Sequence, residues 1–216
     1  MTDKAKEQLE QLSEIRDLMK ENSQFLSLSG LSGVFAGIYA LVGAGLVWSD
    51  FIELVSPSAL DPLREGGAMT IEAIWFKLGY FLLVGVSVLA ASLITGFILT
   101  AGKARKNNRK LLDTAAKKLI LNLFIPLVLG GSFCLALIYH GYIGAVAPAT
   151  LVFYGMALLN AGKYTYRDIR YLGICEMAIG VISMFFMGHA LYFWAFGFGV
   201  LHIIYGLAMY IKYERG

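Results

Sequence analysis

Residues 119–139 read LILNLFIPLVLGGSFCLALIY, and this uninterrupted apolar segment decides the fold. Its 21 residues include no Asp, Glu, Lys or Arg. An α-helix rises 1.5 Å per residue, so a helix of this length measures about 30 Å, the thickness of the hydrocarbon core of a bilayer. A helix also satisfies its own backbone hydrogen bonds, which lipid cannot do. The segment therefore predicts a transmembrane helix.

Apolar segments of similar length recur along the whole chain. The composition agrees with this pattern, because 58% of the residues are hydrophobic, 15% are charged and the mean hydropathy is +0.67. A soluble domain carries about 25% charged residues. We therefore expect an all-α integral membrane protein in which residues 25–213 form a six-transmembrane-helix bundle. The predicted spans are about 25–48, 74–100, 119–139, 144–161, 171–187 and 190–211.

The first 24 residues differ from the rest, being polar and mixed in charge. They contain no apolar core of a secretory signal, so we expect no cleavable leader. Apolar residues nevertheless recur at helical spacing, which predicts an amphipathic helix over residues 1–24. Its apolar stripe would lie on the inner lipid surface or against another protein. The stripe consists of Leu9, Leu12, Ile15, Leu18 and Met19.

The positive charges predict the orientation. Of the 18 Lys and Arg residues, 16 fall on one side of the six-span arrangement, and only Arg64 and Lys77 fall on the other. Positively charged segments stay in the cytoplasm, so we expect a multi-pass protein of the cell membrane with both termini cytoplasmic.

The richest basic segment is residues 101–118, which we expect to be a cytoplasmic loop. Between Lys103 and Lys118 it carries seven positive charges and one acidic residue, Asp113. Such a segment attracts anionic lipid head groups. Docking of a cytoplasmic protein is the alternative. Nucleic acid is not expected as a partner, because no recognition module accompanies the charges.

Glu176 is the most informative single residue, because it lies inside the fifth predicted span. Counted from Arg170 at 1.5 Å per residue, it sits about 9 Å below the inner boundary of the membrane. Acidic residues at such depth are costly and usually face a bundle interior or a water-filled cavity. His202 in the sixth span, with Tyr205 on the same helical face, lies at comparable depth. Asn122 and Asn160 also fall in the inner half.

These five residues predict a polar cavity in the inner leaflet, open toward the cytoplasm, that binds a proton or a small solute. The fifth and sixth spans are consecutive and should pack antiparallel, which places Glu176 within reach of His202. The two side chains could then exchange protons as a coupled pair. The alternative interpretation is interhelical hydrogen bonding, worth about 1 kcal/mol per contact.

Three further sets of residues are weaker candidates. His140 and His189 fall at the outer ends of helices and could ligate a metal, although solvated histidines are the favoured interpretation. Gly33 and Gly37 have the four-residue spacing of close helix contacts, which serve packing within one bundle or a homo-oligomer. Cys134 and Cys175 fall at different depths, so no disulfide is expected.

The sequence favours a small-solute or proton transporter, channel or sensor centred on Glu176. A membrane-anchored regulatory or assembly protein, acting through its N-terminal helix and basic loops, is the first alternative. An intramembrane enzyme is the second, but no metalloprotease, Walker or paired-cysteine motif is present. No residue pattern identifies a cofactor.

Overall fold

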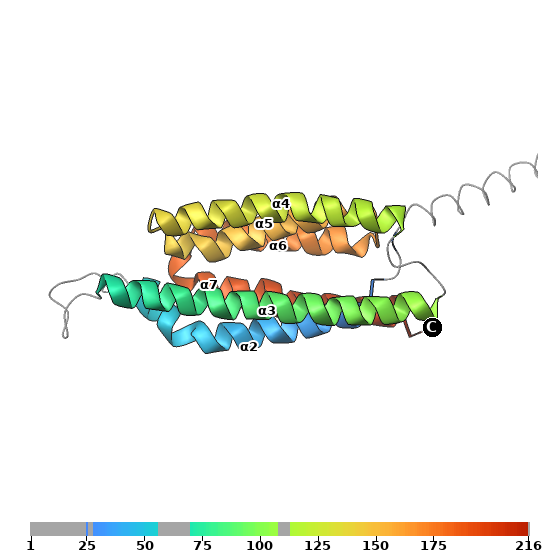
Figure 1. Cartoon of the computed structure of the whole chain (residues 1–216), viewed down its shortest axis with the longest axis horizontal. Coiled ribbons are helices and arrows are strands. Elements are labelled where there is room, and N and C mark those ends of the chain that lie inside the picture. The colour runs from blue at the N-terminus through green and yellow to red at the C-terminus, as the bar shows by residue number, and fades with distance from the viewer. Residues whose placement is uncertain (1–24, 26–27, 56–69, 108–112, 216) are drawn as a thin grey trace, which may run out of the picture.

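The computed structural model describes residues 25, 28–55, 70–107 and 113–215, and these residues are almost entirely helical (Figure 1). Short 3₁₀ turns cover Ile143–Ala145 and Met187–His189. The last helical run is not α-helical throughout. A π-helical segment, Ala195–Leu201, separates two α-helices within it. The α-helices are α2 (Gly30–Val55), α3 (Ile71–Lys106), α4 (Thr114–Tyr139), α5 (Val146–Ala161), α6 (Asp168–Met184), α7 (Ala190–Trp194) and α8 (His202–Tyr213).

Five helical segments in the described part of the chain are long and apolar enough to cross a membrane. They are Gly30–Leu54, Ile71–Lys106, Thr114–Tyr139, Ile143–Ala161 and Met187–Tyr213. This architecture is consistent with the predicted helical membrane bundle. Helix α6 has 17 residues and falls short of that length. A sixth crossing by α6 and the orientation of the termini therefore stay predictions.

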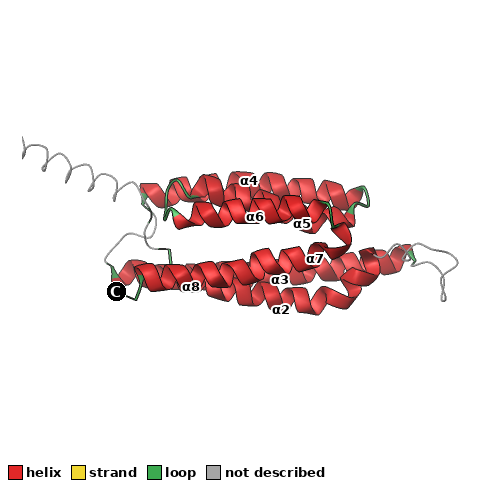
Figure 2. Cartoon of the chain, turned by 180° about the vertical axis from the view of Figure 1, so that it is seen from behind, coloured by secondary structure: helices red, strands yellow, loops and turns green. Residues whose placement is uncertain are grey.

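The helices form two layers of three (Figures 1 and 2). In one layer α5 lies between α4 and α6, and in the other α2 lies between α3 and the run from α7 to α8. The layers meet where α5 and α6 contact α7 and the π-helical segment. The fifth and last predicted spans therefore come together at the junction of the layers, as their antiparallel packing requires.

Glycines allow the closest helix contacts. A Cβ added to Gly155 on α5 would lie 2.5 Å from the carbonyl oxygen of Gly173 on α6, so these backbones touch. A Cβ added to Gly37 would likewise lie 2.5 Å from the carbonyl oxygen of Gly199. Gly33 packs near Gly206. The predicted close contact of Gly33 and Gly37 is thus made within one chain.

Several helix boundaries differ from the predicted ones, among them those of the basic segment 101–118. Helix α3 continues to Lys106, and α4 begins at Thr114, so both ends of the expected loop are helical. Ala, Lys and Arg are strong helix formers, and cations at the end of α3 interact favourably with its dipole. Asp113 starts α4, because its Oδ1 accepts a hydrogen bond from the Ala116 amide at 2.6 Å.

The first span is also shifted. Phe25 lies outside the helix and donates its amide to the carbonyl oxygen of Tyr164 at 2.7 Å. At its other end α2 runs past Trp48 to Val55, because Phe51 continues the apolar face that packs against Ala190 and Leu191. The predicted helix over residues 1–24 and the connection over 56–69 lie outside the described residues.

Candidate functional site

Glu176 is completely buried, with 0% of its surface exposed. Its carboxyl group faces Gly197 of the π-helical segment so closely that a Cβ there would lie 2.5 Å from Oε2 and 2.6 Å from Leu151 Cδ2. Within the described residues neither carboxyl oxygen has a hydrogen-bond partner. Glu176 is therefore enclosed by packed atoms and does not face the open polar cavity expected from the sequence.

His202 is the nearest titratable neighbour of Glu176. It is the first residue of α8 and is 5% exposed. Its Nδ1 lies 3.2 Å from Glu176 Oε1 and 3.1 Å from the carbonyl oxygen of Gly197. The structure thus brings together the two side chains that the sequence placed within reach of each other.

The hydrogen bonds of the imidazole assign its tautomer. A carbonyl oxygen can only accept a hydrogen bond, so His202 Nδ1 must carry a hydrogen to bond Gly197. The other ring nitrogen, Nε2, lies 2.9 Å from the hydroxyl of Tyr154 on α5. In the neutral ring Nε2 is then the acceptor and Tyr154 the donor. A further proton on His202 has to bind Nε2, on the side of Tyr154.

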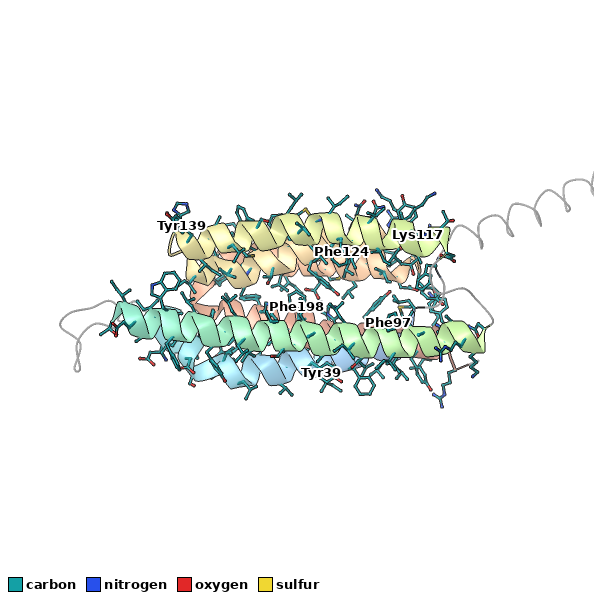
Figure 3. All side chains as sticks on the ribbon, viewed as in Figure 1. Tyr39, Phe97, Lys117, Phe124, Tyr139 and Phe198 are labelled. Carbon is teal, nitrogen blue, oxygen red and sulfur yellow. The ribbon has the colours of Figure 1, made fainter. Side chains whose placement is uncertain are left out.

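Aromatic rings surround this polar group. Phe198 lies between the two layers (Figure 3), with its ring centroid 4.9 Å from that of Tyr154 and 5.8 Å from that of His202. Trp194 extends the aromatic contact, 5.0 Å from Phe198. Such surroundings have a low dielectric constant, which strengthens the interaction between charges on Glu176 and His202.

Tyr205 is the third sequence candidate near the pair. It packs in the same cluster as Tyr154, and its hydroxyl is buried without a hydrogen-bond partner among the described residues. Ser183, two turns beyond Glu176 on α6, has a buried hydroxyl of the same kind and 0% exposure. Buried polar atoms without partners are uncommon in folded proteins, so each requires an explanation.

The two asparagines lie elsewhere and join α4 to α5. The Asn160 amide donates to the backbone carbonyl of Asn122 at 3.2 Å, and the Asn122 amide donates to the carbonyl of Lys118 at 2.8 Å. Lys163 donates to Asn160 Oδ1 at 3.1 Å. Of these three contacts, the one between Asn160 and the Asn122 carbonyl joins two helices, as in the alternative interpretation, and the other two are local. None of the three involves Glu176.

The remaining candidates are separate from this site. His140 and His189 are both exposed at helix ends, where their rings contact Tyr139 and Tyr192. Among the described residues no group of three or more His, Cys, Asp and Glu could hold a metal ion. Cys134 and Cys175 are both free thiols, the first buried and the second exposed.

A second polar cluster, which the sequence did not indicate, closes the end of the molecule where α2 begins and α8 ends. Glu214 Oε1 accepts hydrogen bonds from the Gly30 amide at 2.5 Å and from Lys103 Nζ at 3.2 Å. Ser29 donates to its Oε2 at 3.3 Å. Glu214 therefore caps α2, and the Lys103 side chain paired with it is 11% exposed. No local pattern signals a cap supplied 184 residues away.

Asp168 forms a third cluster at the same end. Its Oδ2 accepts hydrogen bonds from Tyr213 at 2.6 Å and from Lys212 at 3.0 Å. Burial acts to raise the pKa of Asp168, but the hydrogen bonds from Tyr213 and Lys212 and the charge of Lys212 together hold that pKa below its ordinary value. Asp168 is therefore an ionised group at the start of α6.

Comparison of the chain with models of protein families, with curated proteins and with solved structures finds no match.

Proposed function

We propose that this chain is a small multi-pass membrane protein that takes up and releases a proton at Glu176, as part of a proton-linked transporter, channel or sensor. The observation that carries this proposal is a fully buried carboxyl group, without a hydrogen-bond donor among the described residues, 3.2 Å from a histidine nitrogen. Intramembrane carboxyl groups of this kind are typical of proton relays.

The environment of Glu176 supports two protonation states of the pair. Burying an ionised carboxylate away from hydrogen-bond donors costs several kcal/mol. A positive charge on His202, 3.2 Å away, would offset part of that cost. Since each charge depends on the other, the protons belong to the pair and not to either residue alone.

The packing favours a proton over a larger ligand at this position. Gly197 and Leu151 leave no room beside the carboxyl group. Even a methyl group on Gly197 would collide with the carboxyl oxygen of Glu176 and with the Leu151 side chain. A small solute could approach only if the π-helical segment moved. Such segments are frequent at functional sites, and a movement of Ala195–Leu201 would link proton uptake to transport or signalling.

We also propose that the Asp168 end is cytoplasmic and contacts anionic lipids. Exposed basic residues at the end of α3 and the start of α4 support this orientation. They are Arg105, Lys106, Lys117 and Lys118. Lys103 is excluded from that set because it is paired with Glu214.

Glu176→Gln tests the proton site, because it keeps the side-chain volume and removes the titration. Infrared spectroscopy between about pH 5 and pH 9, the range of histidine titration, should show the carbonyl band of a protonated carboxylic acid in the parent. That band should disappear in Glu176→Gln and persist in Glu72→Gln, a control at an exposed position of α3. A band that survives in Glu176→Gln, or a parent without any band, would overturn the proposal.

A further inference from the structure

The unpartnered hydroxyl of Tyr205 lies on one side of the proton site. Tyr205 follows His202 by three residues, which is close to one helical turn towards the end of α8. On α8 it lies between His202 and Tyr213, whose hydroxyl donates to Asp168, and it packs against the same buried cluster as Tyr154. It therefore stands between the buried pair and the ionised cluster at the Asp168 end.

The tautomer of His202 determines where a proton can be added. Since Nδ1 already carries the hydrogen that bonds Gly197, the free position is Nε2, which is bonded to Tyr154. When Nε2 becomes protonated, it turns from acceptor to donor, and the Tyr154 hydroxyl must direct its hydrogen to another acceptor. The Tyr205 hydroxyl is a buried acceptor of suitable chemistry in the same cluster.

Building on the proposed function, we propose that Tyr154 and Tyr205 form the route by which the proton reaches the Glu176–His202 pair, and that the route starts at the Asp168 end. The titratable groups that face the pair are those of Tyr154, Glu176 and His202 themselves. Those nearest Tyr205 along the route are Tyr154, packed against the same cluster, and Tyr213 with Asp168 at the end of α8.

The transfer balances as a relay. The O–H bond of Tyr154 breaks as its proton binds His202 Nε2, and the Tyr154 oxygen receives a proton from Tyr205 through an intervening water. Tyr205 is reprotonated from bulk water at the Asp168 end, so both tyrosines are unchanged. The Nδ1 proton of the imidazolium then leaves the Gly197 carbonyl and passes to the carboxylate oxygen Oε1 of Glu176, 3.2 Å from Nδ1. Starting from a neutral His202 and an ionised Glu176, the net result is a neutral His202 with its hydrogen on Nε2 and a protonated Glu176, with one proton taken from water.

A rival route exists on the other side of the pair. Ser183 also has a buried hydroxyl without a partner among the described residues, and it lies further along α6 than Glu176, away from Asp168. A proton that arrived from the opposite end would pass this residue instead. Ser183 therefore provides a matched comparison for Tyr205.

The test measures the rate at which Glu176 takes up a proton after a pH jump, in the full chain reconstituted in lipid nanodiscs. The readout is the infrared band that Glu176→Gln abolishes. Tyr205→Phe removes a hydroxyl without a hydrogen-bond partner among the described residues, so the protein should fold and the midpoint of the titration should stay unchanged. Loss of a positioned proton carrier should slow the uptake about tenfold or more. Ser183→Ala should keep the parental rate.

The possible outcomes separate the two proposals. A parental rate in Tyr205→Phe, or slow uptake in Ser183→Ala instead, overturns the route while the proton site remains. The absence of any band that depends on Glu176 overturns the proton site and the route together. Tyr39→Phe, which alters a tyrosine bonded to Thr95 between α2 and α3, controls for a general effect of losing a tyrosine hydroxyl.

Discussion

The Nδ1 atom of His202 lies 3.2 Å from Oε1 of Glu176, and this contact joins α6 to α8 across the junction of the two helical layers. The contact does not stand alone, since the same nitrogen bonds Gly197 and the opposite nitrogen bonds Tyr154. Both ring nitrogens of His202 are therefore in polar contacts. The effect of removing these contacts on stability can be measured separately from the effect on function.

We expect His202→Leu to destabilise the protein by about 1–3 kcal/mol, because the Tyr154 hydroxyl and Glu176 then lose their polar neighbour in a buried site. Thermal unfolding in detergent at neutral pH measures this. His189→Leu is the matched control, since His189 is exposed at a helix end. The double variant with Glu176→Gln should lose less than the sum of the two single changes, because contacting residues are coupled. Additive losses would show that the two side chains do not interact.

Gly197→Ala should destabilise the protein by about 1–3 kcal/mol, the usual cost of inserting a methyl group into packed surroundings. The new Cβ would lie 2.5 Å from Glu176 Oε2 and 2.6 Å from Leu151 Cδ2. Gly45→Ala is the control, because nothing lies within 4 Å of that position. In the control the higher helix propensity of Ala should leave the melting temperature equal or raised. Equal melting temperatures for Gly197→Ala and the parent would contradict the tight packing around the carboxyl group.

The contacts of His202 and Gly197 show which parts of the site could be predicted from the sequence. Counting residues from the membrane boundary predicts depth, and depth together with antiparallel packing placed Glu176 beside His202. Depth says nothing about rotation around the bundle, so Asn122 and Asn160 were assigned to the same site although they join α4 to α5. Tyr154 and Gly197 were missed because their roles depend on a neighbouring helix and on a π-helical turn, neither of which has a local sequence signal.

Six crossings require α6 to span the membrane, although its 17 residues are not among the segments long and apolar enough to cross. Single cysteines introduced at Lys163 and Gly188, in a background without Cys134 and Cys175, should be labelled from opposite sides by a membrane-impermeable thiol reagent. A cysteine at Gly141 should share the side of Gly188. Labelling of positions 163 and 188 from the same side would reduce the number of crossings to five and place the two termini on opposite sides.

The pKa of Asp168 predicts a dependence of stability on pH. Burial raises this pKa, but the hydrogen bonds from Tyr213 and Lys212 lower it by more than burial raises it. The pKa in the folded state therefore lies below the unfolded value of about 3.9. Asp168 therefore contributes stability above about pH 4, and that contribution is lost as the pH falls through the folded pKa. Asp168→Asn should melt below the parent at pH 7, and the difference should vanish in acid. A constant difference at every pH would indicate that the charge is not involved.

Glu214→Ala should remove the cap of α2 and destabilise the protein by about 0.5–2 kcal/mol. The reason is that the amide of Gly30 and the ammonium of Lys103 lose the carboxylate they share, and Lys103 is left with the Leu28 carbonyl and Tyr166. Hydrogen exchange followed by mass spectrometry should show faster exchange confined to the first turn of α2. Arg215→Ala is the control, because it changes the neighbouring exposed residue. Faster exchange throughout α8 without any change at Gly30 would instead place the role of Glu214 at the end of α8, and the layer formed by α2, α3 and α8 would then lack the tie that this carboxylate makes between the ends of its helices.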